Sequence, residues 1–580
     1  MRSIFFYAIV LFLFTLSCST KIPSVSRIDN LNSLDTIFYD GKWLLENTES
    51  PEKYNSFLIY PSVGYLSNIQ WPEIIQRKQI KEINNALKYI YDSRGYRPIW
   101  LSSTNKNKNL YTIWLTHIAQ AENHGIDTEI YQFDYINKQI SFYEKGVLSL
   151  EESINLELDL SRNYILMSLH LMYGVSRPII DKDSWLINDQ REKRILKLAD
   201  FQSIRDLERF YKYLLPKSFQ YELMLGNLAL YKSKLSKAPL KTINLSNKNV
   251  LKPGDQDPSI ILIKQRLAFH EELIANKEYM EAEQYDIKLM KVVKNFQRHF
   301  GLVVDANIGP ETLKALNRSP EALIDKIALN MERMRWWPQN LTNRYIQVNV
   351  PSFSLQYVER EKTVLDMKVV VGKYKTKTPI FSDTLEYLVF SPTWIIPKSI
   401  KVEEMLPKLI RDSSYYSGRT FKFYRNWAKN NEVDPMKINW KDYSKAYFPF
   451  KIVQQPGESN ALGLVKFIMP NDLSIYLHDT PAEQKFNFKE RTFSHGCIRL
   501  EKPAELAYAL LDERKKWNFE KIYEAMHLDE PKKVFLPDAC PVFITYFTAY
   551  INEDGILNFR NDVYNFDTMQ KERLISKNKF

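Results

Sequence analysis

The sequence predicts a multidomain α+β protein: an N-terminal α-helical scaffold, a small three-helix module, and a mostly β domain with a helical lid insertion. The chain has 580 residues, and at about 150 residues per domain this length predicts three or four domains. Apolar residues recur at helical spacing up to about residue 320, and from about residue 343 they alternate with polar residues as in half-buried strands. A hydrophobic content of 44% with 26% charged residues permits a large core.

Residues 1–18 predict an export signal. An apolar run from Ile4 to Leu16 follows a short basic start, and it is too short to span a membrane as a helix. Cys18 comes directly after Leu-Ser, which is typical of a lipoprotein processing site, although Thr15 stands where Leu is commoner. We therefore expect a cell-envelope protein that is lipid-anchored to a membrane through Cys18. Plain cleavage of the signal and its retention as an anchor are the alternatives.

Net charge and cysteine content limit the possible partners and chemistry. The formal charge of +11 favours anionic partners, but the lysines form no dense block, so a solvated surface explains the charge and no nucleic-acid partner is expected. Only three cysteines occur, Cys18, Cys497 and Cys540, which is too few for a disulfide framework. If Cys18 is lipidated, at least one of the other two is expected to remain a free thiol. A free thiol in an exported protein indicates a side chain that takes part in a chemical reaction.

Residues 30–250 are predicted to form the helical scaffold. Apolar positions such as Ile83 and Leu87 recur at helical spacing. This region contains no catalytic constellation, and we expect His117 and His124 to be packed or solvated rather than to bind a metal.

Residues 251–320 predict the three-helix module. It opens on the turn L-K-P-G-D and continues through an apolar stripe that includes Ile260 and Leu267. A second amphipathic stretch stops at Gly301, and a third begins with Pro310 at the first helical position, where proline is favoured. The stripes of the three helices are expected to face one another.

Residues 343–528 are predicted to be β-rich, interrupted by an insertion at about 398–448. The insertion contains helix-like pieces such as 402–410, which Pro407 would kink or divide. It is either a lid over a cleft or an ordinary packed insertion. The final segment, 530–580, is expected to pack on this domain and add strands to it.

The candidate chemistry lies in two short segments, Y-L-H-D-T-P with His478 and R-T-F-S-H-G-C-I-R-L with Cys497. A thiol is a good nucleophile only as the thiolate, so it needs a nearby base such as histidine. A chain reversal would bring His478 and Cys497 together. Gly496 leaves room for a substrate, and the amides of Gly496 and Cys497 could face the oxygen of a tetrahedral intermediate. The planar guanidinium of Arg499 suits a carboxylate.

Two other interpretations of Cys497 stay open on the local pattern. His478, His495 and Cys497 are all metal-ligand types, so a zinc site is conceivable, but no fourth ligand stands out. A buried structural cysteine is the second alternative. For Cys540, beside the apolar run P-V-F-I-T-Y, a structural role is expected.

The S-H-G-C-I-R-L motif with its upstream histidine resembles the signature of the YkuD-type L,D-transpeptidases. The wider resemblance is to their long, three-domain periplasmic form, and it extends through R-M-R-W-W-P, V-V-V-G-K, T-P-I-F-S, S-P-T-W-I-I-P and P-G-E-S-N-A-L-G-L-V-K-F. The three-helix module resembles a peptidoglycan-binding module, through L-K-P-G-D, I-K-Q-R-L and V-K-N-F-Q-R-H-F-G-L-V-V-D-A-N-I-G-P-E-T-L. In that module the usual Asp-Gly is Asp305-Ala306, and residues 268–287 lengthen the first connection.

The resemblance implies an enzyme that forms 3→3 peptidoglycan cross-links through a cysteine thioester, and that is acylated by carbapenems. It implies catalytic roles for Cys497 and His478. The other implied site residues are, for the oxyanion hole or for orienting the base, His495, Gly496 and Asp479, and for substrate binding, Arg499 and Tyr476. Stem peptides and glycan would be the partners, and no metal, nucleotide or other cofactor would be needed.

Two further functions are compatible with the sequence. The same Cys-His site would act as an L,D-carboxypeptidase or endopeptidase with water as acceptor, or would attach a protein to the wall or release it. A non-catalytic wall-binding scaffold is the alternative of another class. The intact set of His478, Gly496, Cys497 and Arg499 argues against that alternative.

Overall fold

The computed structural model describes most of the chain from residue 77 onward and one short hairpin before it. The described residues are 36–39, 42–45, 77–92, 98–101, 108–176, 180–181, 183–187, 206–235, 240–246, 248–270, 273, 276–338, 342–416, 420–425, 431–511 and 516–577. The export signal and Cys18 lie outside this set, so lipid anchoring stays a prediction. Of the helices in these ranges, none has both the length and the apolar character needed to cross a bilayer.

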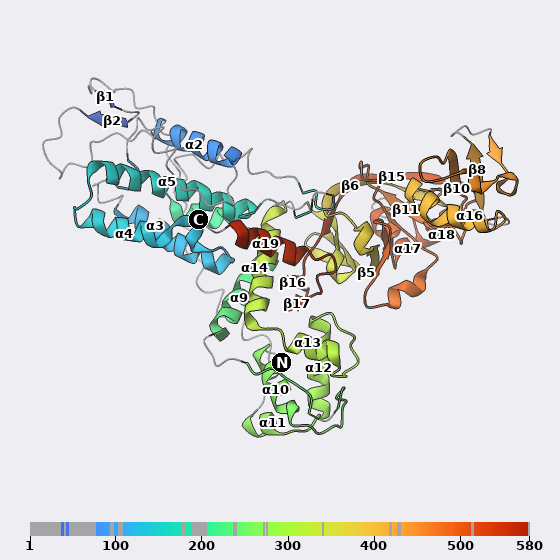
Figure 1. Cartoon of the computed structure of the whole chain (residues 1–580), viewed down its shortest axis with the longest axis horizontal. Coiled ribbons are helices and arrows are strands. Elements are labelled where there is room, and N and C mark those ends of the chain that lie inside the picture. Colours follow the sequence, from blue (N-terminus) through green and yellow to red (C-terminus); the bar gives the residue numbers. More distant parts are fainter. Residues whose placement is uncertain are drawn as a thin grey trace.

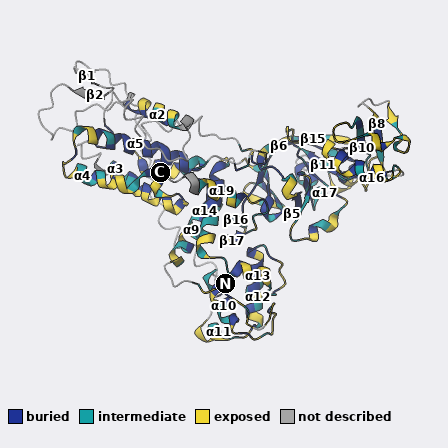
Figure 2. Ribbon diagram, in the orientation of Figure 1, coloured by how far each residue is buried: buried dark blue, intermediate teal, exposed yellow. Residues whose placement is uncertain are grey.

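The N-terminal region is helical, as the apolar spacing predicts (Figure 1). After the hairpin of β1 (Thr36–Tyr39) and β2 (Lys42–Leu45), its main helices are α2 (Arg77–Asp92), α3 (Lys108–Ala119), α4 (Phe133–Glu144), α5 (Leu150–Tyr173), α8 (Leu207–Leu214) and α9 (Phe219–Leu235). A capping box between Ser149 and Glu152 begins α5. Helix α5 is buried on all sides over most of its length and forms the centre of this core (Figure 2). His117 and His124 are both buried.

The module forms the helices that the sequence predicts, together with one short additional helix. It contains α10 (Ser259–Phe269), α11 (Lys277–Glu281), α12 (Ile287–His299) and α13 (Pro310–Leu316). Ala306 has a φ of 64°, in the left-handed region that glycine favours. Its N–H donates to Gln297 Oε1 at 2.9 Å and its carbonyl accepts from the Tyr285 hydroxyl. These two buried contacts hold alanine in a backbone conformation that it adopts only rarely.

The β-rich domain is built on a nine-stranded sheet with the order β13-β5-β14-β12-β11-β6-β15-β3-β4. Strand β4 also pairs with β5, so the sheet closes on itself and leaves β13 outside the ring. The C-terminal segment contributes β15, which lies between β6 and β3. The strands are β3 (Arg344–Asn349), β4 (Ser354–Glu359), β5 (Lys362–Gly372), β6 (Phe381–Phe390), β11 (Val465–Ile468), β12 (Leu477–His478), β13 (Thr492–Ser494), β14 (Ile498–Leu500) and β15 (Lys532–Thr545).

Helices and one more hairpin complete this part of the chain. Helices α17 (Pro503–Leu511) and α18 (Phe519–Met526) pack against the apolar core of the sheet. After β15 the chain forms the hairpin of β16 (Ala549–Ile551) and β17 (Leu557–Phe559) and ends in α19 (Phe566–Lys577).

The insertion is not the helical lid that the sequence predicts. It has its own four-stranded antiparallel sheet in the order β7-β10-β8-β9, and its own core, which includes Met405, Phe423 and Trp440. Pro407 does not divide the helix: helical backbone continues from a π-helical turn at Lys401–Met405 into Leu406–Arg411, and the π-helical turn marks the irregularity before the proline. The elements are β7 (Trp394–Ile395), α15 (Lys398–Ile400), α16 (Leu406–Arg411), β8 (Phe421–Arg425), β9 (Glu432–Val433) and β10 (Phe450–Gln454). The sequence obscured the strands because they are short and carry many charged residues.

Helix α14 (Pro320–Trp336) lies where the helical region, the module and the β-rich domain meet (Figure 1). Leu323, Ile327 and Met331 pack in the apolar core of the module, whereas Trp336 belongs to the core of the β-rich domain. The helix also contacts α9, α5, β16 and α19. It therefore joins parts of the chain that are far apart in sequence.

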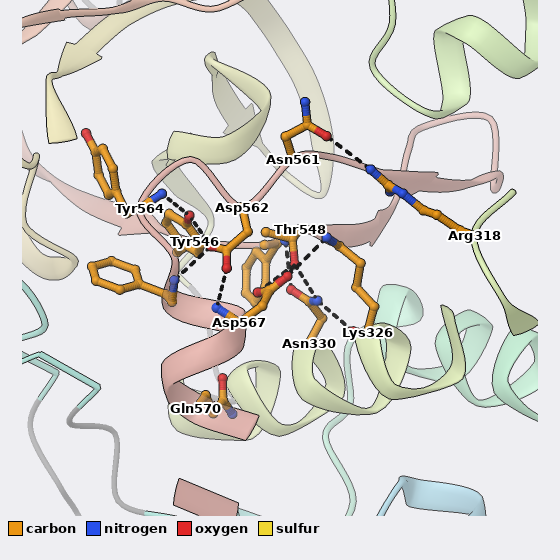
Figure 3. Close-up of polar contacts among 12 residues, drawn as sticks. Arg318, Lys326, Asn330, Tyr546, Thr548, Asn561, Asp562, Tyr564, Asp567 and Gln570 are labelled. Carbon is orange, nitrogen blue, oxygen red and sulfur yellow. Dashed lines mark hydrogen bonds and ion pairs between the residues drawn. The ribbon is translucent and has the colours of Figure 1, made fainter. Parts of the chain in front are cut away.

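Buried charges on α14 bind the C-terminal segment. Arg333 pairs with Asp567 at 2.7 Å and donates to the carbonyl of Tyr546 at 3.1 Å. Asp567 also accepts from Lys326 at 3.0 Å and from the hydroxyl of Thr548 at 2.8 Å (Figure 3). With Arg333 and Lys326 beside it, Asp567 has a pKa below its ordinary value even though burial opposes this shift.

Asp567→Asn should lower the free energy of unfolding by about 3–5 kcal/mol, because it leaves two buried cations without their counter-ion. The matched control is Asp325→Asn, since Asp325 forms an ion pair with Lys571 between the same two helices but half-exposed to solvent. That change should cost at most about 1 kcal/mol. Urea unfolding followed by tryptophan fluorescence measures both, and equal effects of the two changes would contradict this account of the junction.

Candidate active site

Three neighbouring strands bring the candidate residues to one face of the sheet. Antiparallel pairing places Lys466 of β11 opposite His478 of β12, and parallel pairing places Arg499 of β14 on the other side of His478. Tyr476 and Cys497 directly precede β12 and β14, two residues before His478 and Arg499, and the period of two in extended chain directs their side chains to the same face. The structure therefore brings together Tyr476, His478, Cys497 and Arg499, which are separated by up to 23 residues in the chain.

Cys497 carries a free, partly buried thiol. Its Sγ donates to the carbonyl of Ser474 at 3.7 Å. Burial raises the pKa of this thiol, and hydrogen bonds from the backbone and hydroxyl of Tyr476, with the charge of Arg499, only partly oppose this shift. Among the contacts of the described residues, none is a hydrogen bond between Cys497 and His478. The thiol is therefore neutral at rest, and it is held by Tyr476 and Ser474, which precede β12.

His478 is buried and neutral, and the backbone sets its tautomer. Its Nδ1 donates to the carbonyl of Asp479 at 2.6 Å, and because a carbonyl only accepts, the proton lies on Nδ1 and Nε2 keeps its lone pair. Burial, then the charges of Arg499 and Lys466, lower the pKa of His478 to about 3, although the carbonyls of Asp479 and Leu462 act in the other direction. Such an imidazole is in the correct state to accept a proton from a thiol.

The turn before Cys497 directs the amide of that residue. Gly496 has a φ of 121°, which other residues rarely adopt. Its carbonyl accepts from the hydroxyl of Thr378 at 2.7 Å, and since a trans peptide points its C=O and N–H in opposite directions, the N–H of Cys497 points away from Thr378. The sequence also predicted that the N–H of Gly496 faces the intermediate, but in the structure this N–H donates to Ser494 Oγ at 3.1 Å.

Thr378 is in turn held by the C-terminal segment. The hydroxyl of Tyr564 accepts from the N–H of Thr378 at 3.1 Å and donates to the carbonyl of Gly372 at 2.6 Å. The N–H of Tyr564 donates to the hydroxyl of Tyr546 at 2.8 Å, and Tyr546 donates to Asp562 at 2.6 Å (Figure 3). A continuous set of hydrogen bonds therefore runs from the junction at α14 to the peptide before Cys497.

The insertion contacts the site at two points. His495, the residue of the motif nearest to solvent, donates from Nε2 to Glu404 in the π-helical turn of the insertion at 2.6 Å. Trp394 of β7 donates to Tyr476, which lowers the pKa of Tyr476, although burial and the neighbouring Cys497 together raise it above its ordinary value. The insertion therefore forms one wall of the site.

Sequence reasoning assigned no role to several residues of this site. Thr378, Trp394 and Lys466 all lie in segments that carry the family resemblance, but their position beside the thiol depends on strand pairings between distant segments. Glu404 lies in the insertion, where no motif marked it. As to metals, the described residues contain no group of three or more His, Cys, Asp or Glu side chains that would hold an ion.

The site combines a histidine at the end of a strand with a free cysteine directly before the neighbouring strand, which makes it a candidate site for cysteine acyl transfer. Comparisons with known proteins match the domain that contains it to a family. Residues 343–518 match the L,D-transpeptidase catalytic domain of the YkuD family. Residues 85–228 match the family described as scaffold domain, and residues 256–316 match the "Putative peptidoglycan binding domain" family. The chain thus carries an L,D-transpeptidase catalytic domain together with a peptidoglycan-binding domain.

Individual relatives agree with this family. A curated protein of Haemophilus influenzae, described as "Putative L,D-transpeptidase", is 35% identical over 245 residues. The match covers 42% of this chain and 48% of that protein, so the chain spans about half the length of the curated relative it matches.

Solved L,D-transpeptidases match only distantly. The enzyme of Stackebrandtia nassauensis is 14% identical, over 53% of this chain and 97% of its own, with a TM-score of 0.20. The enzyme of Mycobacterium smegmatis is 13% identical, over 35% and 58% of the two chains, with a TM-score of 0.18. These scores are too low to support any inference about this chain.

The rate at which iodoacetamide alkylates Cys497 should rise with pH through a midpoint above the ordinary thiol pKa of about 8.5, because burial disfavours the thiolate. Peptide mapping by mass spectrometry between pH 6 and 10 measures the rate at this residue and separates it from fully buried Cys540. A plateau reached below pH 7 would instead indicate a preformed thiolate–imidazolium pair and would contradict the described site.

Proposed function

We propose that this protein is an L,D-transpeptidase that forms 3→3 peptidoglycan cross-links through a thioester on Cys497. The observation that carries the proposal is the free thiol of Cys497 on the same sheet face as His478, whose neutral imidazole keeps its Nε2 lone pair. A nucleophile next to a base oriented by a third group is the arrangement that covalent acyl transfer requires. Here the third group is the carbonyl of Asp479.

In the first step Cys497 transfers its proton to His478 as Sγ attacks the carbonyl of the diamino acid at position three of a donor tetrapeptide. Because the resting thiol is neutral and His478 is a weak base, proton transfer accompanies the attack and does not precede it. The N–H of Cys497 donates to the developing oxyanion. The bond to the terminal D-Ala then breaks, the D-Ala amine takes the proton from His478, and a thioester remains.

In the second step the side-chain amine of another stem attacks the thioester carbonyl. His478 accepts the proton of this amine and returns it to Sγ as the C–S bond breaks. The product is a cross-link between two residues at position three, and the thiol is restored. Every proton transfer in both steps uses His478, and the chemistry calls for no cofactor.

The second candidate function differs only in the acceptor. Water attacking the thioester would give an L,D-carboxypeptidase, and a protein amine would give attachment to the wall. The insertion contacts the site through His495 and Tyr476, which supports transpeptidation to the extent that this wall restricts access of water to the thioester. The peptidoglycan-binding domain supports the cell envelope as the place of action.

Incubation of the purified chain with disaccharide-tetrapeptide, followed by mass spectrometry, tests the proposal. We expect a dimeric muropeptide that has lost one D-Ala, no product with Cys497→Ala, and a carbapenem adduct on Cys497. A tripeptide without dimer would instead establish the carboxypeptidase. Neither turnover nor an adduct would contradict the enzyme function and would leave a non-catalytic wall-binding protein.

Thr378→Val should lower kcat about 10-fold and leave KM unchanged, because Thr378 positions the peptide that carries the Cys497 N–H and does not touch the substrate. The loss should be smaller than the roughly 100-fold or greater loss that follows removal of a whole oxyanion donor. Thr378→Ser keeps the hydroxyl and should restore the rate. Steady-state kinetics with the tetrapeptide donor, with melting temperature as a fold control, measures both variants. A serine variant as slow as the valine variant would contradict this role for the hydroxyl.

A further inference from the structure

Two positive side chains beside His478 have no acidic partner in the described part of the chain. Lys466 and Arg499 flank His478 on the two adjacent strands, and both are partly buried. Among the described residues, neither takes part in a hydrogen bond or an ion pair with an acidic group, and Nε of Arg499 is buried without any partner. The nearest aromatic contact of Lys466 places its Nζ 6.0 Å from the ring centre of Tyr476.

The surrounding charges leave this pair uncompensated. Burial lowers the pKa of both side chains; Cys497 acts to raise that of Arg499, but no carboxylate of the described part of the chain raises either one. Lys485 lies close enough to Arg499 and Lys373 for their charges to lower its own pKa further. The acidic groups bordering the site are otherwise engaged: Asp479 accepts from the N–H of Leu464 at 2.7 Å, and Glu404 accepts from His495.

Burying a cation without a partner costs free energy, so two such cations on either side of His478 favour the binding of an anion. Other buried cations of the chain have hydrogen-bond acceptors: Arg333 and Lys326 share Asp567, Arg335 pairs with Glu332 at 2.6 Å, and Lys264 donates to the carbonyls of Tyr279 and Ala282. The positive side chains of the junction thus have acceptors within the chain, whereas Lys466 and Arg499 have no acidic partner among the described residues. On the catalytic face, the missing negative charge belongs to the ligand.

We propose that Lys466 and Arg499 together bind a carboxylate of the donor stem peptide, and that Lys466 is a specificity-determining residue of this enzyme. This inference rests on the proposed function and names the chemical class of its substrate: a donor whose carboxylate lies within about one residue of the attacked carbonyl. The two cations lie two residues along the strands from Tyr476 and Cys497, a separation of about 7 Å at 3.3 Å per residue. Strand β12 separates their strands, so at about 4.8 Å per strand spacing the two backbones lie about 10 Å apart. The long side chains of lysine and arginine can reach across this gap, so one carboxylate can bind both above His478.

Two carboxylates of a tetrapeptide donor lie within about one residue of the attacked carbonyl. One is the second carboxylate of a diamino dicarboxylic acid at position three, which would stay bound through both steps. The other is the terminal carboxylate of the leaving D-Ala, which would depart after the first step. Both present the same chemistry to an ammonium and a guanidinium group.

Kinetics of Lys466→Met on three donors tests the proposal with the purified full chain. The donors are the free tetrapeptide, one with the side-chain carboxylate of residue three amidated, and one ending in D-alaninamide. On the free tetrapeptide we expect kcat/KM to fall about 10- to 100-fold, the range for a lost charge-assisted hydrogen bond. On the donor that lacks the bound carboxylate, wild type and variant should differ by less than about 3-fold, and that donor identifies which carboxylate is bound.

Three controls keep the outcomes separate. Lys466→Arg should restore most of the activity, because it keeps the charge, and Lys533→Met, which removes an exposed lysine of β15, should have no effect. Alkylation of Cys497 by uncharged iodoacetamide should persist in Lys466→Met, showing that the site is still formed.

The result that overturns the inference is an equal loss on all three donors, since Lys466 would then act only through the charge state of His478. Failure of wild type to acylate with any donor would instead overturn the proposed function itself.

Discussion

The buried ion pair between Arg333 and Asp567 is the interaction on which the rest of the structure depends. It joins α14, which packs in the core of the module and reaches that of the β-rich domain, to the C-terminal helix α19. Arg335 on the same helix binds the helical region through the carbonyl of His124 at 3.0 Å and the hydroxyl of Tyr221 at 2.8 Å. A buried charge pair tolerates little change in geometry, because moving either partner exposes an uncompensated charge to an apolar surrounding. The helix therefore fixes the relative positions of three parts of the chain.

The same junction extends to the catalytic cysteine. Asp562 and Tyr546 hold Tyr564, Tyr564 holds Thr378, and Thr378 holds the carbonyl before the Cys497 amide. Each contact is a direct hydrogen bond between groups that are largely removed from water, where such bonds are most directional. The C-terminal segment thus contributes to the catalytic geometry although it lies beyond the catalytic motif in sequence.

The catalytic face differs from the junction in its electrostatics. At the junction every buried charge finds an opposite charge within the chain, which favours rigidity. At the catalytic face Lys466 and Arg499 have no acidic partner among the described residues, His478 is neutral, and the thiol of Cys497 is protonated. This arrangement is unfavourable by itself and becomes favourable when an anionic substrate supplies the missing charge, so that binding and activation of the site are coupled.

The sequence by itself determined the helical region, the module and the change to strands, and it placed Cys497 and His478 in two nearby segments, because these features depend on local periodicity and short spacings. The family resemblance suggested Asp479 as the residue that orients the base, and in the structure its carbonyl lies 2.6 Å from Nδ1 of His478. Only the tertiary structure decided that the insertion contains its own sheet, that Ser494 occupies the N–H of Gly496, and that Thr378, Lys466 and Glu404 lie beside the site. The physical reason is that strand pairing and buried polar contacts join residues far apart in the chain, 118 positions for Thr378 and Gly496 and 186 for Thr378 and Tyr564, and no local pattern records such partners.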